Sequence, residues 1–304
     1  MAVNTACKLN LFEFIASKPV NSRQIALEME LNLIALQSLL NALVASDFLE
    51  LNEELYSLTF SSLQLTENHP KSLKYACMNW AEEHLNAWQN LDYSIKTGKS
   101  SFTHLTGENY FEYLNNYPEK LDKYHKAMFE YARDDYAELH LKINFEKHNS
   151  ILDVGGGYGA AISTIKANFP AINCGLFDLK NVIRNCILPN IELIDGDFFS
   201  SIPTEFDALI LSRILHDWND EKAEVILENC FKALPRNGNL YLIENCSDLI
   251  STDLSLLSLN MLAMCESYER TLNYYQHLCT KSGFTFENAI NLNELQTIII
   301  FKKS

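Results

Sequence analysis

Three carboxylates and a run of glycines in the second half of the chain could hold a cofactor. Asp153 ends the apolar run ILDV, and three consecutive glycines follow at 155–157. Asp178 ends the next apolar run, and Asp197 follows the third. Because glycine has no Cβ, its backbone can turn tightly and approach a ligand closely. The pattern therefore predicts a nucleotide-type cofactor at the N-terminus of the helix that follows.

The positions and charges of these acids indicate which cofactor fits. Asp178 stands nineteen residues after Gly159, where its carboxylate can accept hydrogen bonds from both hydroxyls of a ribose. Asp197 can accept one from an adenine amino group, with Phe198 against the ring. Three acids at the ends of three successive runs suit a positively charged ligand without phosphate. S-adenosylmethionine is such a ligand, because it carries a sulfonium and an ammonium group and no pyrophosphate.

The glycine run alone is also compatible with a different cofactor. Gly155, Gly157 and Ala160 fit the relaxed dinucleotide-binding pattern. A nicotinamide or flavin dinucleotide would place its pyrophosphate on the N-terminus of the following helix. An oxidoreductase is therefore an open alternative on this pattern.

These residues need a framework that brings the ends of distant strands together. From residue 149 onward, short apolar runs alternate with helical stretches of about 10–20 residues, as in crossover connections between parallel strands. This alternation predicts an α/β fold with a doubly wound, mostly parallel sheet. A loop alone separates the last two runs, which predicts an antiparallel hairpin at one end of the sheet. The predicted strands are 151–154, 172–177, 191–194, 208–211, 240–243, 284–289 and 295–301.

Residues 1 to about 70 are predicted to form a small helical domain closed by a β-hairpin, in the order helix, helix, helix, hairpin that is typical of a winged helix. Winged helices often bind DNA, yet residues 24–70 include seven acids and no lysine or arginine. The whole chain has a formal net charge of −15, which repels phosphate backbones. We therefore expect no nucleic-acid partner and interpret the leucine-rich helix at 33–44 as a packing or dimerisation surface.

Residues 71–145 are predicted to be helical and rich in aromatic side chains, which can form an ordinary core or wall a pocket for a flat ligand. The eight cysteines are scattered without a C-x-x-C pair, so we expect free thiols, as in a reducing cytoplasm, and no metal site. No apolar run approaches the ~20 residues that cross a bilayer, and the N-terminus is a poor signal peptide. These features predict a cytoplasmic protein that does not bind membranes.

Five motifs in order, ILDVGGGYG, GLFDL, DGDFF, LHDWNDE and ERT, together identify a family. The chain resembles the cation-independent, S-adenosylmethionine-dependent O-methyltransferases, which include plant phenylpropanoid and bacterial polyketide enzymes. The resemblance covers most of the chain and implies a Rossmann-like seven-stranded methyltransferase sheet with an N-terminal helical winged-helix domain. It implies a dimerisation domain at 1–92 and a cofactor-binding domain at 93–304, in which 93–148 is a helical substrate-pocket segment and 149–304 the Rossmann-like core.

The resemblance also implies the chemistry, which is in-line transfer of a methyl group to a hydroxyl of an aromatic or polyketide-like small molecule. His216 matches the general base of the family, and a phenol with a pKa near ~10 needs such a base at neutral pH. Glu244 and Glu269 match glutamates that flank and orient the base. Asp217, Met128 and Met261 are expected to contact the substrate. The expected cofactor contacts are Asp153, Gly155, Gly157, Asp178, Leu179, Asp197, Phe198, Ser212 and Arg213.

The chain departs from the family pattern at three places, and one of them is Asn260 and Ser258, where the family often has charged or apolar residues. The family commonly has two glycines before Glu-Arg-Thr, where this chain has Met264-Cys-Glu-Ser-Tyr, so we expect a narrower pocket or a changed substrate. The chain also begins close to the first winged-helix segment, whereas many relatives begin some tens of residues earlier. The usual homodimer is therefore expected to be smaller or differently built.

Two further alternatives accompany the oxidoreductase. A fold relative can bind S-adenosylmethionine and catalyse N- or C-methylation or a non-methylating reaction, because a fold does not fix chemistry. A transcriptional regulator can be built on a winged helix. Retention of His216, Glu244 and Glu269 favours methyl transfer, and the lack of basic residues in the winged helix disfavours a regulator.

Overall fold

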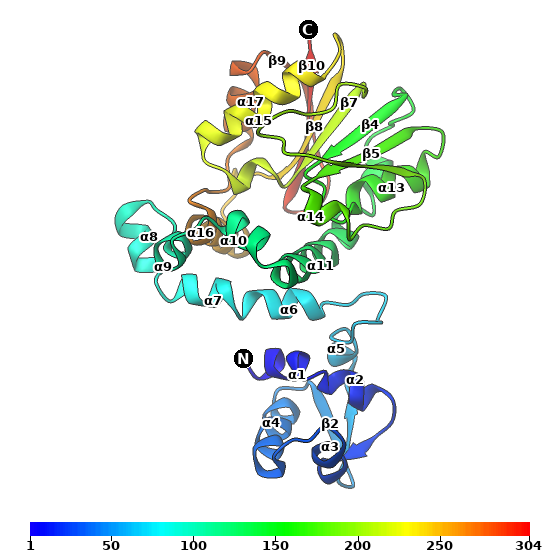
Figure 1. Cartoon of the computed structure of the whole chain (residues 1–304), viewed down its shortest axis with the longest axis vertical. Helices are drawn as coiled ribbons and strands as arrows, with labels where there is room; N and C mark the ends of the chain where they lie inside the picture. The colour runs from blue at the N-terminus through cyan, green and yellow to red at the C-terminus, as the bar shows by residue number, and fades with distance from the viewer. The chain divides into compact units, whose positions relative to one another are not determined.

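The computed structural model describes all 304 residues, which form two compact units. Unit 1 comprises residues 1–83 and 126–131, and unit 2 comprises residues 84–125 and 132–304 (Figure 1). Helix α11 (Pro118–Asp135) contributes residues to both units. The domain boundary expected at residue 92 stays a prediction.

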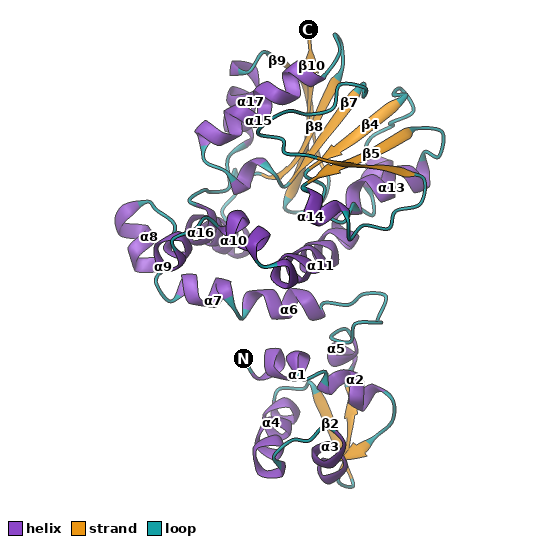
Figure 2. Ribbon diagram, viewed as in Figure 1, coloured by secondary structure: helices purple, strands orange, loops and turns teal.

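Unit 1 is a helical fold closed by a three-stranded antiparallel sheet in the order β1-β3-β2 (Figure 2). The expected helical domain with a β-hairpin is confirmed, but its first helix is split, because Asn10 adopts a left-handed conformation with φ 55°. Asn21 and Asn32 cap two later helices by accepting hydrogen bonds from first-turn amides. The elements are α1 (Ala2–Lys8), α2 (Leu11–Ala16), β1 (Val20–Asn21), α3 (Ser22–Glu28), α4 (Leu33–Ala45), β2 (Leu49–Asn52), β3 (Leu55–Leu58), α5 (Phe60–Leu63) and α6 (Lys74–Trp80).

Unit 2 contains a seven-stranded sheet in the order β6-β5-β4-β7-β8-β10-β9. The five strands from β6 to β8 are parallel, and β10 runs antiparallel to both of its neighbours. The predicted sheet and its terminal hairpin are therefore confirmed. The strands are β4 (Ser150–Val154), β5 (Asn173–Asp178), β6 (Ile191–Asp195), β7 (Ala208–Ser212), β8 (Asn239–Asn245), β9 (Phe284–Asn291) and β10 (Gln296–Lys303).

Helices cover both faces of this sheet, as Figure 1 shows, because its central strands are apolar on both sides. In β7, Leu209 and Leu211 point into one core with α15 and α17, whereas Ala208 and Ile210 point into the other with α12 and α13. The helices of unit 2 are α7 (Glu83–Trp88), α8 (Leu91–Thr97), α9 (Ser101–Thr106), α10 (Tyr110–Asn116), α12 (Leu139–Lys142), α13 (Ala160–Asn168), α14 (Lys180–Ile183), the 3₁₀ turn η1 (Leu215–Asp217), α15 (Asp220–Ala233), α16 (Thr252–Cys265) and α17 (Leu272–Lys281).

The strand order reverses between β4 and β7, since the chain moves outward to β5 and β6 and then returns to the other side of β4. Ligands of open α/β sheets bind outside the carboxyl ends of the strands at such a switch point. We therefore expect the ligand site among the loops that follow β4, β5, β6, β7 and β8. No helix of the chain is both long and apolar enough to span a membrane.

Candidate functional site

The glycine turn after β4 is a backbone cradle. Gly155 and Gly157 have φ values of 73° and 59°, in the left-handed region that other residues rarely adopt. A Cβ on Gly155 would lie 2.7 Å from Ile214 Cδ1 and 3.2 Å from Phe198 Cε1. Both the conformation and the space around the turn therefore require glycine, and Phe198 lies beside the turn, while its predicted contact with an adenine ring stays a prediction.

Asp178 ties this turn to the end of β5. Its carboxylate oxygens accept hydrogen bonds from the amides of Gly157 at 2.8 Å and Leu179 at 2.7 Å. Burial raises the pKa of Asp178 to about 6, and the two amide hydrogen bonds oppose that rise. The side chain is thus an ionisable acceptor fixed at the carboxyl end of β5, and its contact with a ribose stays a prediction.

Asp153 lies at the end of β4 and is almost completely buried. Neither of its carboxylate oxygens accepts a hydrogen bond of good geometry, and burial raises its pKa to about 7 against a smaller opposing effect of the Ile162 backbone amide. An unpartnered buried carboxyl is costly, and a cationic ligand would supply the missing partner. Together with the glycine cradle and Asp178, this orphaned acid fits a positively charged cofactor better than a pyrophosphate.

The third acid, Asp197, lies in the exposed turn after β6, where its Oδ1 accepts a hydrogen bond from the amide of Phe199 at 2.8 Å. Ser212, the last residue of β7, donates to the hydroxyl of Tyr136 at 2.5 Å. Arg213 follows with φ 55°, and its guanidinium lies 3.8 Å from Asp135. The structure thus places the predicted cofactor residues at the carboxyl ends of β4 to β7. It also shows Tyr136 beside Ser212, a contact whose only sequence signal is the aromatic ring of Tyr136.

His216 is buried on η1, directly after β7. Its Nδ1 lies 2.9 Å from Glu269 Oε1, and because a carboxylate can only accept, Nδ1 carries the hydrogen. The Nε2 atom is therefore the proton acceptor of the neutral ring, 3.6 Å from Asp217 Oδ1. Burial lowers the pKa of His216, but the carboxylates of Glu269, Asp217 and Glu244 outweigh it and raise the pKa to about 9.

Glu269 and Glu244 act on His216 in different ways. Burial raises the pKa of Glu269, but the neighbouring His216 outweighs it and holds that pKa below its usual value. The Nδ2 atom of Asn245 donates to the same Glu269 oxygen at 3.2 Å. Glu244 hydrogen-bonds the backbone instead of the ring, since its Oε1 accepts from the amides of Ile214 at 3.1 Å and Leu215 at 2.8 Å. Glu244 thus orients the turn, whereas Glu269 orients the imidazole.

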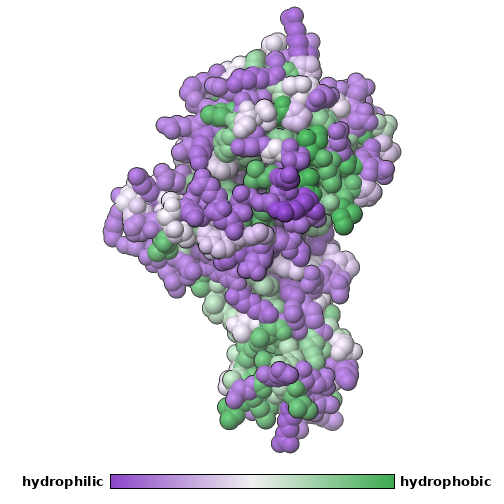
Figure 3. Space-filling view, viewed as in Figure 1, coloured by the Kyte–Doolittle hydropathy of each residue, from purple (hydrophilic) through white to green (hydrophobic).

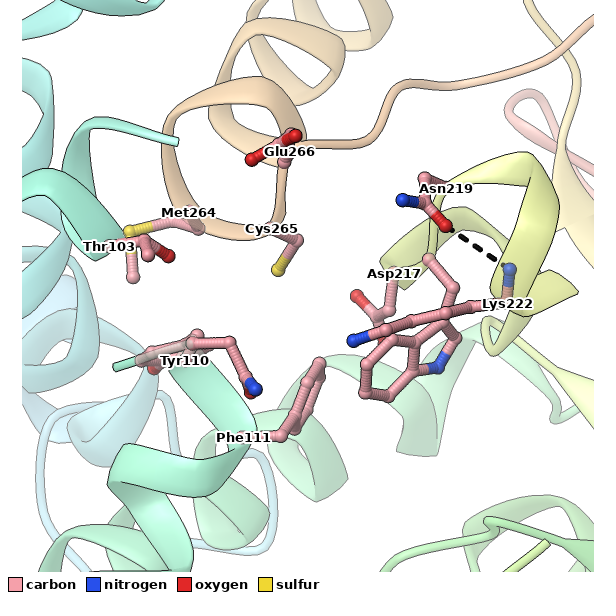
Figure 4. Close-up of a pocket in the computed structure, with 11 residues that line it drawn as sticks. Thr103, Tyr110, Phe111, Asp217, Asn219, Lys222, Met264, Cys265 and Glu266 are labelled. Carbon is pink, nitrogen blue, oxygen red and sulfur yellow. Dashed lines mark hydrogen bonds between the residues drawn. The ribbon is translucent and has the colours of Figure 1, made fainter. Parts of the chain in front are cut away.

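A pocket of about 150 Å³ opens beside this turn (Figure 4). In Figure 4 the carboxylate of Asp217 and the sulfur of Cys265 point toward the same space, with the ring of Phe111 below them. The rings of Phe111 and Trp218 lie 5.2 Å apart and form an aromatic wall. The lining residues are Thr103, Asn109, Tyr110, Phe111, Asp217, Trp218, Asn219, Lys222, Met264, Cys265 and Glu266.

The pocket brings together only part of the predicted substrate set. Asp217 lines it, and burial raises the pKa of that carboxyl to about 6 against the opposing charges of His216 and Arg213. Met261 is buried within α16 and does not line this pocket, whereas Met128 belongs to unit 1. Glu266 lies in the stretch where the resemblance leads us to expect a pair of glycines, and it follows the last residue of α16 with φ 56°, a conformation that glycine adopts without strain.

Comparisons with known proteins identify the family. A family model described as the O-methyltransferase domain matches residues 88–285, and one described as the O-methyltransferase dimerisation domain matches residues 1–68. The chain belongs to the O-methyltransferase family. It is an S-adenosylmethionine-dependent methyltransferase, as its sequence motifs predict. The oxidoreductase and regulator alternatives are set aside, because the first match spans the glycine turn and the second spans the winged helix.

Individual relatives show the breadth of this family. The chain is 26% identical to the phenazine O-methyltransferase PhzM of Lysobacter antibioticus, over 94% of this chain and 87% of that protein. It is 29% identical to an anthranilate N-methyltransferase of Ruta graveolens, over 93% and 84%. The crystal structure of LaPhzM superposes with a TM-score of 0.95 at 25% identity, covering 100% of this chain and 95% of that one. The family therefore includes methyl transfer to nitrogen as well as to oxygen.

Proposed function

We propose that this methyltransferase transfers a methyl group to a hydroxyl of an aromatic or polyketide-like small molecule, with His216 as the general base. The observation that carries the proposal is the 2.9 Å contact between His216 Nδ1 and Glu269, which leaves Nε2 as the acceptor. Nε2 lies 3.6 Å from Asp217, and Asp217 in turn lines the pocket. A hydroxyl acceptor needs such a base, because the neutral oxygen is a poor nucleophile. Since the neighbouring carboxylates raise the pKa of His216 to about 9, the neutral ring that can accept a proton becomes more populated as the pH rises toward 9.

The cofactor is held, in this proposal, by Asp153, Asp178 and the glycine turn, with Phe198 beside it. When bound, S-adenosylmethionine supplies an electrophilic methyl group on a positively charged sulfur. His216 Nε2 would accept the proton of the acceptor hydroxyl as its oxygen forms a bond to the methyl carbon and the carbon–sulfur bond breaks, which would leave the neutral thioether S-adenosylhomocysteine. The imidazolium that forms is stabilised by the carboxylate of Glu269. General-base catalysis of this kind contributes about 10²–10⁴-fold to the rate.

The acceptor ring is proposed to lie in the pocket beside His216. A cavity of about 150 Å³ has the size of one that takes a benzene ring in another protein. The aromatic wall of Phe111 and Trp218 suits a flat molecule, and Asp217 supplies a polar contact at its inner end. Met264, Cys265 and Glu266 narrow the pocket where the family commonly has small residues, so a single-ring phenol is the preferred acceptor.

Methyl transfer to nitrogen is the second candidate, favoured by the anthranilate N-methyltransferase among the relatives. A labelled-methyl assay with matched phenols and anilines separates the two. We expect transfer to the phenols, with a rate that depends on His216. Transfer to the anilines alone, at a rate indifferent to replacement of His216, would replace the first proposal with the second.

We also propose that the chain is a cytoplasmic homodimer with a small-molecule substrate. The match of residues 1–68 to a dimerisation domain supports self-association. Unit 1 exposes large apolar side chains, and Figure 3 shows apolar surface there, with Leu27, Ile34 and Phe60 each more than three-quarters exposed. All eight cysteines are free, which suits a reducing compartment. Light scattering after size exclusion should give twice the chain mass of 34.8 kDa, and a monomer would contradict the dimer.

A further inference from the structure

Arg270 is a fully buried guanidinium next to the proposed base. It is 1% exposed and directly follows Glu269 in the chain. Its Nη1 donates to the carbonyl oxygen of Leu215 at 2.8 Å, and its Nη2 donates to that of Trp218 at 2.7 Å. These two carbonyls flank His216 and Asp217 on either side. Arg270 therefore bridges the two ends of the turn that carries the base.

A second set of contacts fixes the guanidinium itself. Its Nε and Nη2 donate to Asp220 Oδ1 at 3.1 and 2.9 Å. The other oxygen of Asp220 accepts a hydrogen bond from the hydroxyl of Tyr274 at 2.5 Å. Burying an arginine is costly unless its charge and its donors are satisfied, and here a carboxylate and two carbonyls accept four hydrogen bonds from it.

Two side chains of opposite charge thus hold the turn. Glu244 accepts from the amides of Ile214 and Leu215 where the chain enters the turn, and Arg270 donates to carbonyls around it. Glu269 fixes the imidazole ring, and its sequence neighbour Arg270 fixes the backbone that bears the ring. The adjacent residues Glu269 and Arg270 therefore fix both the orientation of the imidazole ring and the position of the backbone that carries it.

We propose that Arg270 is a positioning residue that holds the His216 turn in register with Glu269 and the pocket. This inference rests on the proposed role of His216 as base. Misplacement of a catalytic group by about 1 Å can cost 10²-fold in rate, so loss of the bridge acts on turnover. A guanidinium that served the fold alone would affect unfolding and leave the folded enzyme equally active.

Arg270→Lys tests the proposal, because lysine keeps the charge and cannot donate to both carbonyls and Asp220 in the fork geometry of arginine. We expect kcat to fall about 10–100-fold while the Kd for S-adenosylhomocysteine changes less than about 2-fold. The acid limb of the pH profile of kcat should move to lower pH, because a looser turn weakens the His216–Glu269 contact that raises the base's pKa. Arg236→Lys, at an exposed position, is the matched control and should leave kcat, the Kd and the pH profile unchanged.

Asp220→Asn is the second variant, and its partly exposed side chain makes unfolding less of a risk. It should lower kcat about 3–10-fold, with the same direction of shift in the pH profile. The proposal is overturned if both variants fold and show wild-type kcat and an unchanged acid limb of the pH profile. If Arg270→Lys does not fold, the same result for Asp220→Asn alone overturns it. Wild-type activity of His216→Gln would instead overturn the proposed base and leave the bridging geometry untouched, so the two failures are distinguishable.

Discussion

The part of the sheet's carboxyl edge that we propose holds the cofactor and the part around the proposed base His216 are built in different ways, and we refer to them as the cofactor half and the catalytic half. At the cofactor half, backbone conformation determines the shape of the turn. Gly155 and Gly157 adopt left-handed φ values, and Asp178 holds the turn by accepting a hydrogen bond from the amide of Gly157. At the catalytic half, buried charged side chains fix the geometry, since the imidazole of His216 is oriented by Glu269, which lies 53 residues away in the sequence. The first half is a local motif, whereas the second is an assembly of distant segments.

This difference predicts a division of labour that mutations can test. Changes in the cofactor half should act on affinity for S-adenosylmethionine, and changes in the catalytic half should act on turnover. A change in the cofactor half that lowers turnover, or a change in the catalytic half that weakens cofactor binding, would show that the two halves are coupled.

The largest effect is expected for His216→Gln. Loss of the base should lower kcat with a phenolic acceptor by about 10²–10⁴-fold, while the Kd for S-adenosylhomocysteine stays within about 2-fold. Steady-state kinetics and calorimetry measure the two quantities, and the exposed His277→Asn serves as the control. A kcat within 3-fold of the wild type would remove His216 from the mechanism.

Asp178→Asn should produce the opposite pattern. The amide keeps one acceptor oxygen but loses the charge and one of the two hydrogen bonds to Gly157 and Leu179. We expect the Kd for S-adenosylmethionine to rise about 10–100-fold, with kcat at saturating cofactor nearly unchanged. Asp195→Asn, at the exposed end of the neighbouring strand β6, should leave the Kd unchanged. Equal effects of the two variants would argue against a specific contact by Asp178.

The affinity for S-adenosylmethionine should also fall as the pH drops. Burial raises the pKa of Asp178 to about 6 and that of Asp153 to about 7, so both are ionised at pH 8 and increasingly protonated below these values. Protonation removes negative charge facing a cationic ligand, and the Kd should rise about 10-fold or more between pH 8 and pH 5. S-adenosylhomocysteine, which lacks the sulfonium charge, should show a weaker dependence. Equal pH dependence for both ligands would contradict a charge-based site.

The smallest effect is expected for Glu266→Gly. Glycine adopts the left-handed conformation at the end of α16 without strain, so the free energy of unfolding should rise by about 0.5–1 kcal/mol. The pocket should also widen, and two-ring phenols should gain in kcat/KM relative to one-ring phenols. Urea unfolding and a series of acceptors of increasing size measure the two effects. Unchanged selectivity would show that Glu266 does not limit the acceptor.

The sheet could be predicted closely from the sequence. Every end of the seven strands lies within two residues of its predicted position, because short apolar runs with polar breaks are a local signal. The cofactor turn could also be predicted from the sequence, because the type of a single residue is the signal. Glycine is the residue that adopts a positive φ readily, and an acid at the end of a strand is visible in the sequence. The N-terminal domain differed where Asn10 breaks its first helix, a conformation that its neighbours do not require.

The catalytic half could be predicted only as a set of residues, without its connections. The resemblance identified His216, Glu244 and Glu269, but the contact of Glu244 with backbone amides depends on how η1 lies against β8. The bridge formed by Arg270 and the contact of Tyr136 with Ser212 have no spacing signal, because their partners lie 55 and 76 residues away. Such contacts follow from tertiary packing, which periodicity does not encode.

The central claim is that buried carboxylates hold a positively charged methyl donor within reach of the His216 imidazole. The most direct test is an NMR titration of ¹⁵N-labelled His216, free and with each cofactor form. The pKa should be about 9 in the free enzyme and nearly the same with S-adenosylhomocysteine. With S-adenosylmethionine it should fall by about one unit or more, because a nearby positive charge disfavours the imidazolium. An identical pKa with both ligands would contradict the claim.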